Sequence, residues 1–192
     1  MNSSVIHQVF EPSIANKLEL DTVLNSFDLI ECHKGDTLLS EGQYASEYYF
    51  VESGFLRAYA IDTRGNDITT GFYGQGQILW EVASLFLQTP TKENIEVLQS
   101  GKLWRITLSK FQELFDTIAD FRDSGRTRLV QNHVKLKQRS LSMITDKAEV
   151  RYLTLMKEHP EIFQMSTLKH IATYLGITDS SLSRIRRDII KK

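Results

Sequence analysis

The chain has 192 residues, of which 41% are hydrophobic and 24% charged, and its formal net charge is -1. This composition supports one large or two small folded domains and excludes extended disorder. The sequence contains no run approaching eighteen apolar residues and no signal-peptide pattern at its start. We therefore expect a cytoplasmic protein with no membrane contact.

Cysteine and histidine usage limits the possible cofactors. Cys32 is alone, which excludes an intrachain disulfide framework and a cysteine-ligated cluster. We expect it to be a small buried residue of a strand. The histidines form no metal-ligand spacing: His7, His33, His133, His159 and His170. No metal, haem or iron-sulfur cluster is expected.

The first part of the chain predicts helices and then strands. Residues 5–27 predict one or two short helices that pack on the outside of the β-rich region. Eight of the ten glycines lie between Gly35 and Gly101, and they separate short segments rich in aromatic and β-branched residues: 48–53, 55–61, 68–73, 93–98 and 103–107. Many short strands at regular spacing indicate a jelly-roll arrangement, here of about eight strands.

Helical patterns begin after residue 108. A short helix is expected from Ser109, and then a long helix from about residue 120 or 123 to 144. Its apolar residues form two stripes, one of Leu129, Leu136 and Met143, and one of Val130, Val134, Leu141 and Ile144. A helix buried on two sides needs two partners, and we expect these to be its own barrel and a second copy in a coiled coil. A core helix within a single chain is the alternative.

The last third predicts a helix over 148–158, with Val150, Leu153 and Met156 buried, and a break at Pro160. Residues 167–187 then predict two short helices joined by a tight turn. Gly176 provides the positive φ that ends the first helix, and the small Ala172 lets the helices cross closely. The two inward stripes are Leu168, Ile171 and Leu175 in the first helix, and Leu182, Ile185 and Ile189 in the second.

The outward face of the second helix is polar and cationic, and its size suits a DNA major groove. We predict that this face contacts DNA through Thr178, Ser180, Ser181, Ser183, Arg184 and Arg187.

The charge distribution also favours the C-terminal end of the chain as the part that contacts nucleic acid. Residues 146–192 carry nine Lys/Arg and six Asp/Glu, a net +3, which leaves -4 for residues 1–145. Cations gathered at one end favour local contact with phosphate, for which Arg186, Lys191 and Lys192 are candidates.

Four pieces of the sequence together resemble one known family. They are Lys34-Gly35-Asp36 with Glu41-Gly42, then Tyr49-Phe50-Val51 with Ser53-Gly54, then Phe72-Tyr73-Gly74-Gln75-Gly76 with Trp80-Glu81, and finally the helix-turn-helix. In this order they resemble the Crp/Fnr family of bacterial transcription regulators.

The resemblance implies an α+β fold with an N-terminal jelly-roll barrel like that of cyclic-nucleotide-binding proteins (residues 1–117), a long dimerisation helix (118–145) and a helix-turn-helix domain (146–192). It also implies a homodimer, with Leu129, Leu136 and Met143 at the interface, that binds a pseudo-palindromic DNA site. Arg184 matches the arginine that the family directs at a guanine. RNA polymerase and a small-molecule effector are further candidate partners.

The effector site departs from the family pattern. Nucleotide-binding members have a glycine before the glutamate of their phosphate cassette and an arginine about ten residues later. Here Trp80 precedes Glu81, and Thr91-Lys92 lies where the arginine would fall. We therefore expect no cyclic AMP binding in the usual mode, and a structural role for Glu81 as a cap. The residues expected around an effector pocket are Trp80, Glu81, Val82, Thr91, Lys92 and Asn132; the alternative is that no effector exists.

Two other classes of function remain open. The chain could be a ligand-binding or protein-interaction module whose helical end docks on a partner protein, although the C-terminal cations argue against it. An enzyme is the weakest option, because the sequence has no clustered histidines and carboxylates, no phosphate-binding loop and no nucleophile with a positioned base.

Overall fold

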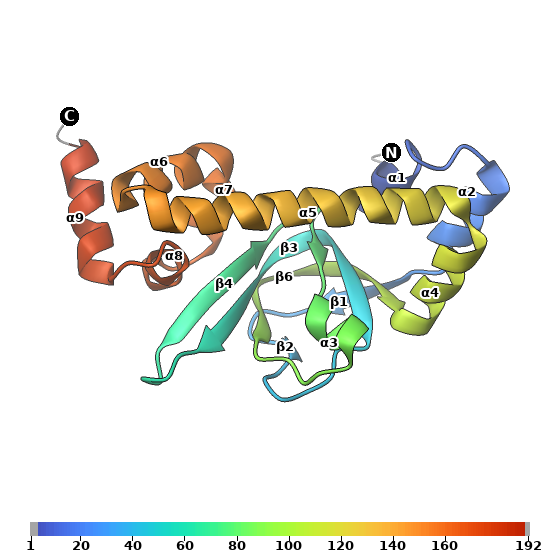
Figure 1. The fold of residues 1–192 in the computed structure, drawn as a ribbon, viewed down its shortest axis with the longest axis horizontal. Coiled ribbons are helices and arrows are strands. Elements are labelled where there is room, and N and C mark those ends of the chain that lie inside the picture. Colours follow the sequence, from blue (N-terminus) through green and yellow to red (C-terminus); the bar gives the residue numbers. More distant parts are fainter. Residues whose placement is uncertain (1–3, 191–192) are drawn as a thin grey trace.

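The computed structural model describes residues 4–190, in which the β-rich region forms one antiparallel sheet of six strands. Its order is β1-β6-β3-β4, with β2 paired to β6 and β5 paired to β3. The sheet curls on itself below a long helix (Figure 1), and we call it the barrel. The strands are β1 (Asp28–Cys32), β2 (Thr37–Leu39), β3 (Glu47–Ile61), β4 (Asp67–Tyr73), β5 (Ile78–Leu79) and β6 (Asn94–Thr107).

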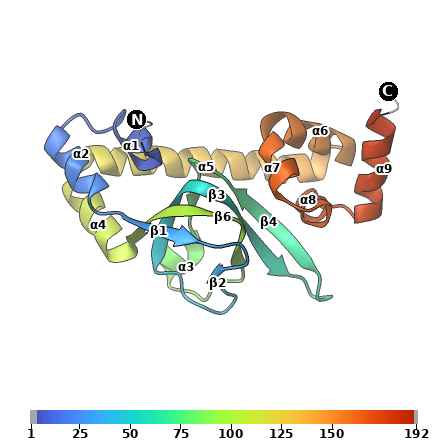
Figure 2. The same ribbon diagram turned by 180° about the vertical axis from the view of Figure 1, so that it is seen from behind.

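Apart from α3, which lies against the strands away from the long helix, the helices lie along one side of the barrel (Figure 1). Figures 1 and 2 show α5 above it from end to end, with α1, α2 and α4 near the first turns of α5 and α6 to α9 at its far end. The helices are α1 (Val5–Phe10), α2 (Lys17–Leu24), α3 (Val82–Leu87), α4 (Leu108–Thr117), α5 (Ala119–Thr145), α6 (Ala148–Glu158), α7 (Pro160–Met165), α8 (Leu168–Tyr174) and α9 (Asp179–Ile190). The predicted α+β class is confirmed.

The expected strand count was too high, because two strands are bent where the sequence suggested breaks. β3 continues through Gly54 and β6 through Gly101, with shifts of register in their pairing. Gly54 has a φ of +95°, and a Cβ on Gly101 would lie 2.1 Å from the carbonyl oxygen of Ser53. The two backbones therefore approach where only glycine fits, and the strands bend without ending.

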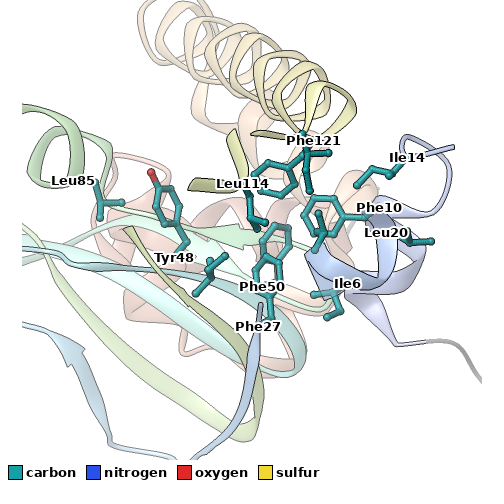
Figure 3. Close-up of a cluster of buried hydrophobic side chains, with 13 residues drawn as sticks. Ile6, Phe10, Ile14, Leu20, Phe27, Tyr48, Phe50, Leu85, Leu114 and Phe121 are labelled. Carbon is teal, nitrogen blue, oxygen red and sulfur yellow. The ribbon is translucent and has the colours of Figure 1, made fainter. Parts of the chain in front are cut away.

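A large apolar core joins the first helices to the barrel (Figure 3). Phe10 of α1 lies between Phe50 of β3 and Phe121 of α5, with ring centroids 5.5 and 5.4 Å from its own. The N-terminal helices predicted from residues 5–27 are therefore present, and their apolar residues are part of this core. Cys32 is 2% exposed at the end of β1, as its predicted structural role requires.

Only the start of α5 is buried in this chain. Phe121 and Ser124 are buried, whereas both predicted apolar stripes beyond them are exposed: Leu129 47%, Val130 63%, Val134 46%, Leu136 56%, Leu141 48%, Met143 39% and Ile144 80%. The expectation that one stripe packs on the barrel is wrong, because α5 contacts its own chain beyond its first turns largely through arginines. The alternative of a core helix within one chain is excluded by the same exposure.

The predicted inward face of α6 was also wrong. Val150, Leu153 and Met156 are exposed, whereas Tyr152 and Leu155 are 5% and 7% exposed. Both sets are apolar and lie on neighbouring faces of the helix, so periodicity alone cannot choose between them. The choice is made by α7 and α8, whose buried residues share one cluster with Tyr152 and Leu155.

Candidate nucleic-acid interface

The predicted helix-turn-helix is formed by α8 and α9. Thr167 caps α8 by accepting a hydrogen bond from the amide of His170 (3.2 Å), and Gly176 has the expected positive φ of +67°. The amide of Ile177 donates to the carbonyl of Ala172 (3.0 Å), which closes the turn. Thr178 then accepts from the amide of Ser181 (3.3 Å) and so begins α9.

Buried side chains fix the angle between the two helices. Ile171 and Ala172 are 0% exposed and Leu182 is 1% exposed, while Ile185 and Ile189 are half-buried in the same cluster. The inward stripe predicted for α9 is therefore confirmed. The inward stripe predicted for α8 included Leu168, and this part of the prediction is wrong. Leu168 is 40% exposed, because α8 packs through its C-terminal half.

The outward face of α9 is accessible. Thr178, Ser180, Ser183, Arg184 and Arg187 are exposed, and Ser181 is half-buried with its hydroxyl hydrogen-bonded to Thr178 (3.0 Å). Within residues 4–190, neither Arg184 nor Arg187 forms a hydrogen bond or an ion pair. Figure 1 shows α9 standing at the end of the molecule, clear of the barrel. Lys191 and Lys192, predicted as phosphate contacts, lie outside the described residues.

The residues predicted for the effector pocket have different surroundings in the structure. Trp80 packs against the apolar core, with its ring 5.9 Å from that of Tyr48. Glu81 accepts a hydrogen bond from the amide of Ser84 (2.5 Å) at the start of α3, which is the capping role expected for it. Val82 and Lys92 are exposed, and Asn132 is half-buried on α5.

Thr91 has a structural role instead. It is 3% exposed, its amide donates to the carbonyl of Gln43 (2.8 Å), and its carbonyl accepts from the amide of Gly42 (2.9 Å). Thr91 thereby ties the segment after α3 to the loop between β2 and β3.

A different cavity lies beside that loop. It is partly open to solvent and has a volume of about 400 Å³, and of the six predicted residues only Glu81 lines it. The hydroxyl of Tyr49 donates to Glu47 there (2.5 Å), and burial, together with this bond, raises the pKa of Tyr49. The sequence signal for this pair was its i, i+2 spacing, which places both side chains on one strand face. The other lining residues are Leu38, Leu39, Gln43, Tyr44, Ala45, Ser46, Leu79 and Ile95.

Neither a metal-binding cluster nor a membrane-spanning helix is found in the part of the chain that the structure describes. Residues 4–190 contain no cluster of three or more His, Cys, Asp or Glu side chains that could hold a metal ion. None of the helices in that range combines the length and the apolar character that a membrane span requires.

Comparisons with known proteins agree with this geometry. The family model of the cyclic nucleotide-binding domain matches residues 29–118, which include the whole of the barrel beyond the first residue of β1. The fumarate and nitrate reduction regulatory protein of Yersinia pestis is 25% identical over 193 aligned residues, which cover 94% of this chain and 76% of that protein. These similarities support a regulator of the Crp/Fnr type. The curated relatives are named as regulatory proteins, so the similarity supports a transcription regulator and not an enzyme.

Solved structures share the fold of this chain at low sequence identity. FixK2 from Bradyrhizobium japonicum superimposes with a TM-score of 0.74 at 15% identity, over 86% of this chain and 85% of that one. The global regulator CLP of Xanthomonas campestris, described as responsive to c-di-GMP, gives a TM-score of 0.71 at 16% identity, over 92% of each chain.

Proposed function

We propose that this chain is a Crp/Fnr regulator that binds a pseudo-palindromic DNA site as a homodimer, with α9 of each protomer in the major groove. The observation that carries the proposal is the exposed outward face of α9, where Arg184 has no partner among residues 4–190. A guanidinium can donate two hydrogen bonds to O6 and N7 of guanine. Thr178, Ser180, Ser181 and Ser183 would add hydroxyl contacts, and Arg187 would meet a base or a phosphate.

The dimer is proposed to form along α5. Leu129 and Leu136 are about half exposed, and a second α5 would bury them. Met143, the third residue predicted for this interface, has its terminal methyl group beside Gly176, so it would also support the turn between α8 and α9. Two α9 helices in successive major grooves must lie about 34 Å apart, and a paired α5 would hold them at a constant separation.

We propose a separate role for each of the three predicted domains, which are residues 1–117, 118–145 and 146–192. The barrel would act as the sensor, α5 as the dimerisation element and the last four helices as the DNA-reading head. The cavity of about 400 Å³ beside Tyr49 and Glu81 is large enough for a small-molecule effector. RNA polymerase would be a partner on promoter DNA, and the protein would act in the cytoplasm.

The test is to select a binding site from random DNA with the wild-type protein, and then to measure Arg184→Ala against Arg64→Ala. Arg64 is an exposed arginine in the turn between β3 and β4, far along the chain from α9. Loss of a bidentate guanine contact should reduce the discrimination between the selected and a scrambled site by about 1–3 kcal/mol per half-site, with unchanged circular dichroism.

Arg64→Ala should keep the full discrimination. If Arg184→Ala keeps it as well, Arg184 does not read a base. If the wild-type protein enriches no sequence but captures one protein reproducibly, the head is a protein-docking module and the proposal fails.

A further inference from the structure

Arg139 of α5 connects the three parts of the molecule. Its guanidinium donates to the carbonyl of Thr70 in β4 (2.9 Å) and to the carbonyl of Tyr174 in α8 (3.2 Å). The same group lies 4.1 Å from the centre of the Tyr174 ring. One side chain of the long helix therefore contacts both the barrel and the helix-turn-helix.

The contact between β4 and α8 is also direct. The amide of Thr69 donates to the hydroxyl of Thr173 (3.1 Å), which in turn donates to the hydroxyl of Thr69 (3.3 Å). The rings of Phe72 and Tyr174 lie 5.1 Å apart. Because β4 ends the order of the sheet, α8 covers an edge whose polar groups would otherwise face water.

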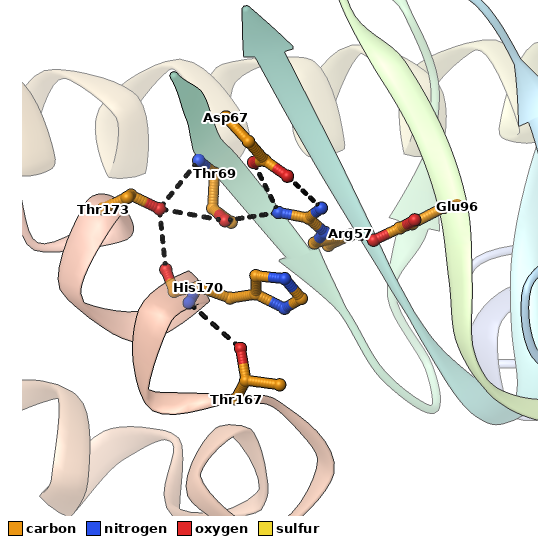
Figure 4. Close-up of polar contacts among 7 residues, drawn as sticks. All are labelled: Arg57, Asp67, Thr69, Glu96, Thr167, His170 and Thr173. Atoms are coloured by element: carbon orange, nitrogen blue, oxygen red, sulfur yellow. Dashed lines mark hydrogen bonds and ion pairs between the residues drawn. The ribbon is translucent and has the colours of Figure 1, made fainter. Parts of the chain in front are cut away.

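A buried arginine, paired with two half-buried carboxylates, holds β4 in place from the barrel side (Figure 4). Arg57 of β3 is 3% exposed, and its guanidinium donates to both carboxylate oxygens of Asp67 (2.7 and 2.5 Å) and to Glu96. It also donates to the hydroxyl of Thr69 (3.1 Å), which is the group that meets Thr173 of α8. Arg57 thus fixes the position of β4, and Thr69 of β4 contacts α8 directly.

The end of β4 leads towards the cavity. Tyr73, the last residue of the strand, packs against the apolar cluster that contains Leu79 and Ile95, and both of these residues line the cavity. A ligand that moved Leu79 or Ile95 would therefore act, through Tyr73, on the strand that carries the Arg139 and Thr173 contacts.

We propose that Arg139 is the positioning residue that sets the orientation of α9 relative to the barrel, and that β4 is the element through which the barrel controls DNA reading. The inference rests on the proposed function, since it assigns the regulation of that same DNA-binding face. Arg139 would not contact DNA itself, because it lies on α5 and the proposed DNA-contacting side chains lie on α9. It would act by holding α8, and with it α9, against the barrel.

The orientation can be measured without DNA. Spin labels at Lys102→Cys in β6 and Asp188→Cys in α9 report the distance between barrel and head, in dimers diluted with unlabelled chain. Both positions are exposed, while the native Cys32 is buried. The parent protein should give one narrow distance distribution.

Arg139→Ala should broaden that distribution about twofold or more, since the head loses its fork of hydrogen bonds and its ring contact. Arg139→Lys should give a similarly broad distance distribution, because an ammonium cannot make the same planar pair of contacts. Arg126→Ala is the matched control, an exposed arginine of the same helix, and should stay narrow. Thr173→Val should broaden the distribution and Thr173→Ser should restore it.

DNA binding then tests the consequence. Arg139→Ala should lower the affinity for the selected site about tenfold, or about 1.4 kcal/mol, with the base preference at each position unchanged. A distribution as narrow as that of the parent protein overturns the inference, as does a broad distribution with unchanged affinity. If the wild-type protein selects no DNA, the proposed function fails, and the label distances still decide whether Arg139 sets the orientation.

Discussion

At the residue scale, the junction between barrel and head places an ionisable side chain beside a buried cation. His170 of α8 is half-buried next to the cluster of Arg57, Asp67 and Glu96 (Figure 4), and its Nδ1 has no hydrogen-bond partner among residues 4–190. Burial first, and then the charge of Arg57, lower the pKa of His170 below its usual value of 6.5. Lys169 adds to this effect, whereas Asp67 and Glu96 oppose it.

The junction should therefore weaken in acid. A histidine whose pKa is lowered in the folded state binds more protons when the protein is unfolded or the junction is undocked. Its contribution to the free energy of unfolding is therefore complete above about pH 6.5 and is lost as the pH falls towards the lowered pKa. Lowering the pH from about 7.5 to about 5.5 should reduce the unfolding temperature of the wild-type protein more than that of His170→Gln. Equal reductions in the two proteins would show that His170 does not titrate at this junction.

At the element scale, the barrel depends on strands that bend at glycines without breaking. Gly54 and Gly101 lie opposite each other on β3 and β6, and added side-chain atoms there would meet backbone. Backbone cannot move aside as the end of a flexible side chain can, so this close approach determines the path of both strands.

Gly101→Ala should therefore destabilise the protein by about 1–3 kcal/mol or more, measured by urea denaturation, because its Cβ would lie 2.1 Å from the carbonyl oxygen of Ser53. Gly74→Ala is the control, since a Cβ at Gly74 would meet only the ring of Phe55, at 3.4 Å. A loss for Gly101→Ala no larger than that for Gly74→Ala would contradict the steric argument.

At the scale of the whole molecule, α5 is the axis to which everything else is attached. The barrel and the first helices hold its beginning, the head is attached to its end, and its apolar residues from Leu129 onward are exposed between them. An exposed apolar stripe on an otherwise polar helix is costly in water, and a second copy of the same helix would cover it.

Leu136→Glu should make the protein monomeric at concentrations where we expect the wild-type protein to be dimeric, because a carboxylate at the proposed interface would be buried against its own symmetry mate. Gln138→Glu adds the same charge at an exposed polar position of α5 and should leave the dimer intact. Light scattering after gel filtration measures both. A dimeric Leu136→Glu protein would place the interface elsewhere.

Local sequence patterns were sufficient for the turn between α8 and α9 and for the packing of α9. The turn at Gly176, the small Ala172 and the inward stripe of α9 all follow from neighbours within a few residues, and the structure has each of them. Patterns that depend on distant partners were not predictable in the same way. Periodicity chose the wrong face of α6. Trp80 and Thr91, which were expected around an effector pocket, contact parts of the chain that are distant in the sequence.

The sequence by itself determined that the chain has a β-rich part, a long helix and a helix-turn-helix with an arginine-bearing outer face, because propensity, capping and short-range burial act within one element. Tertiary structure alone decided that two strands bend at paired glycines, that a cavity opens beside Tyr49, and that Arg139 contacts β4 and α8 together. Each of these depends on two segments meeting in space, and the free energy of such a contact is not contained in either segment alone.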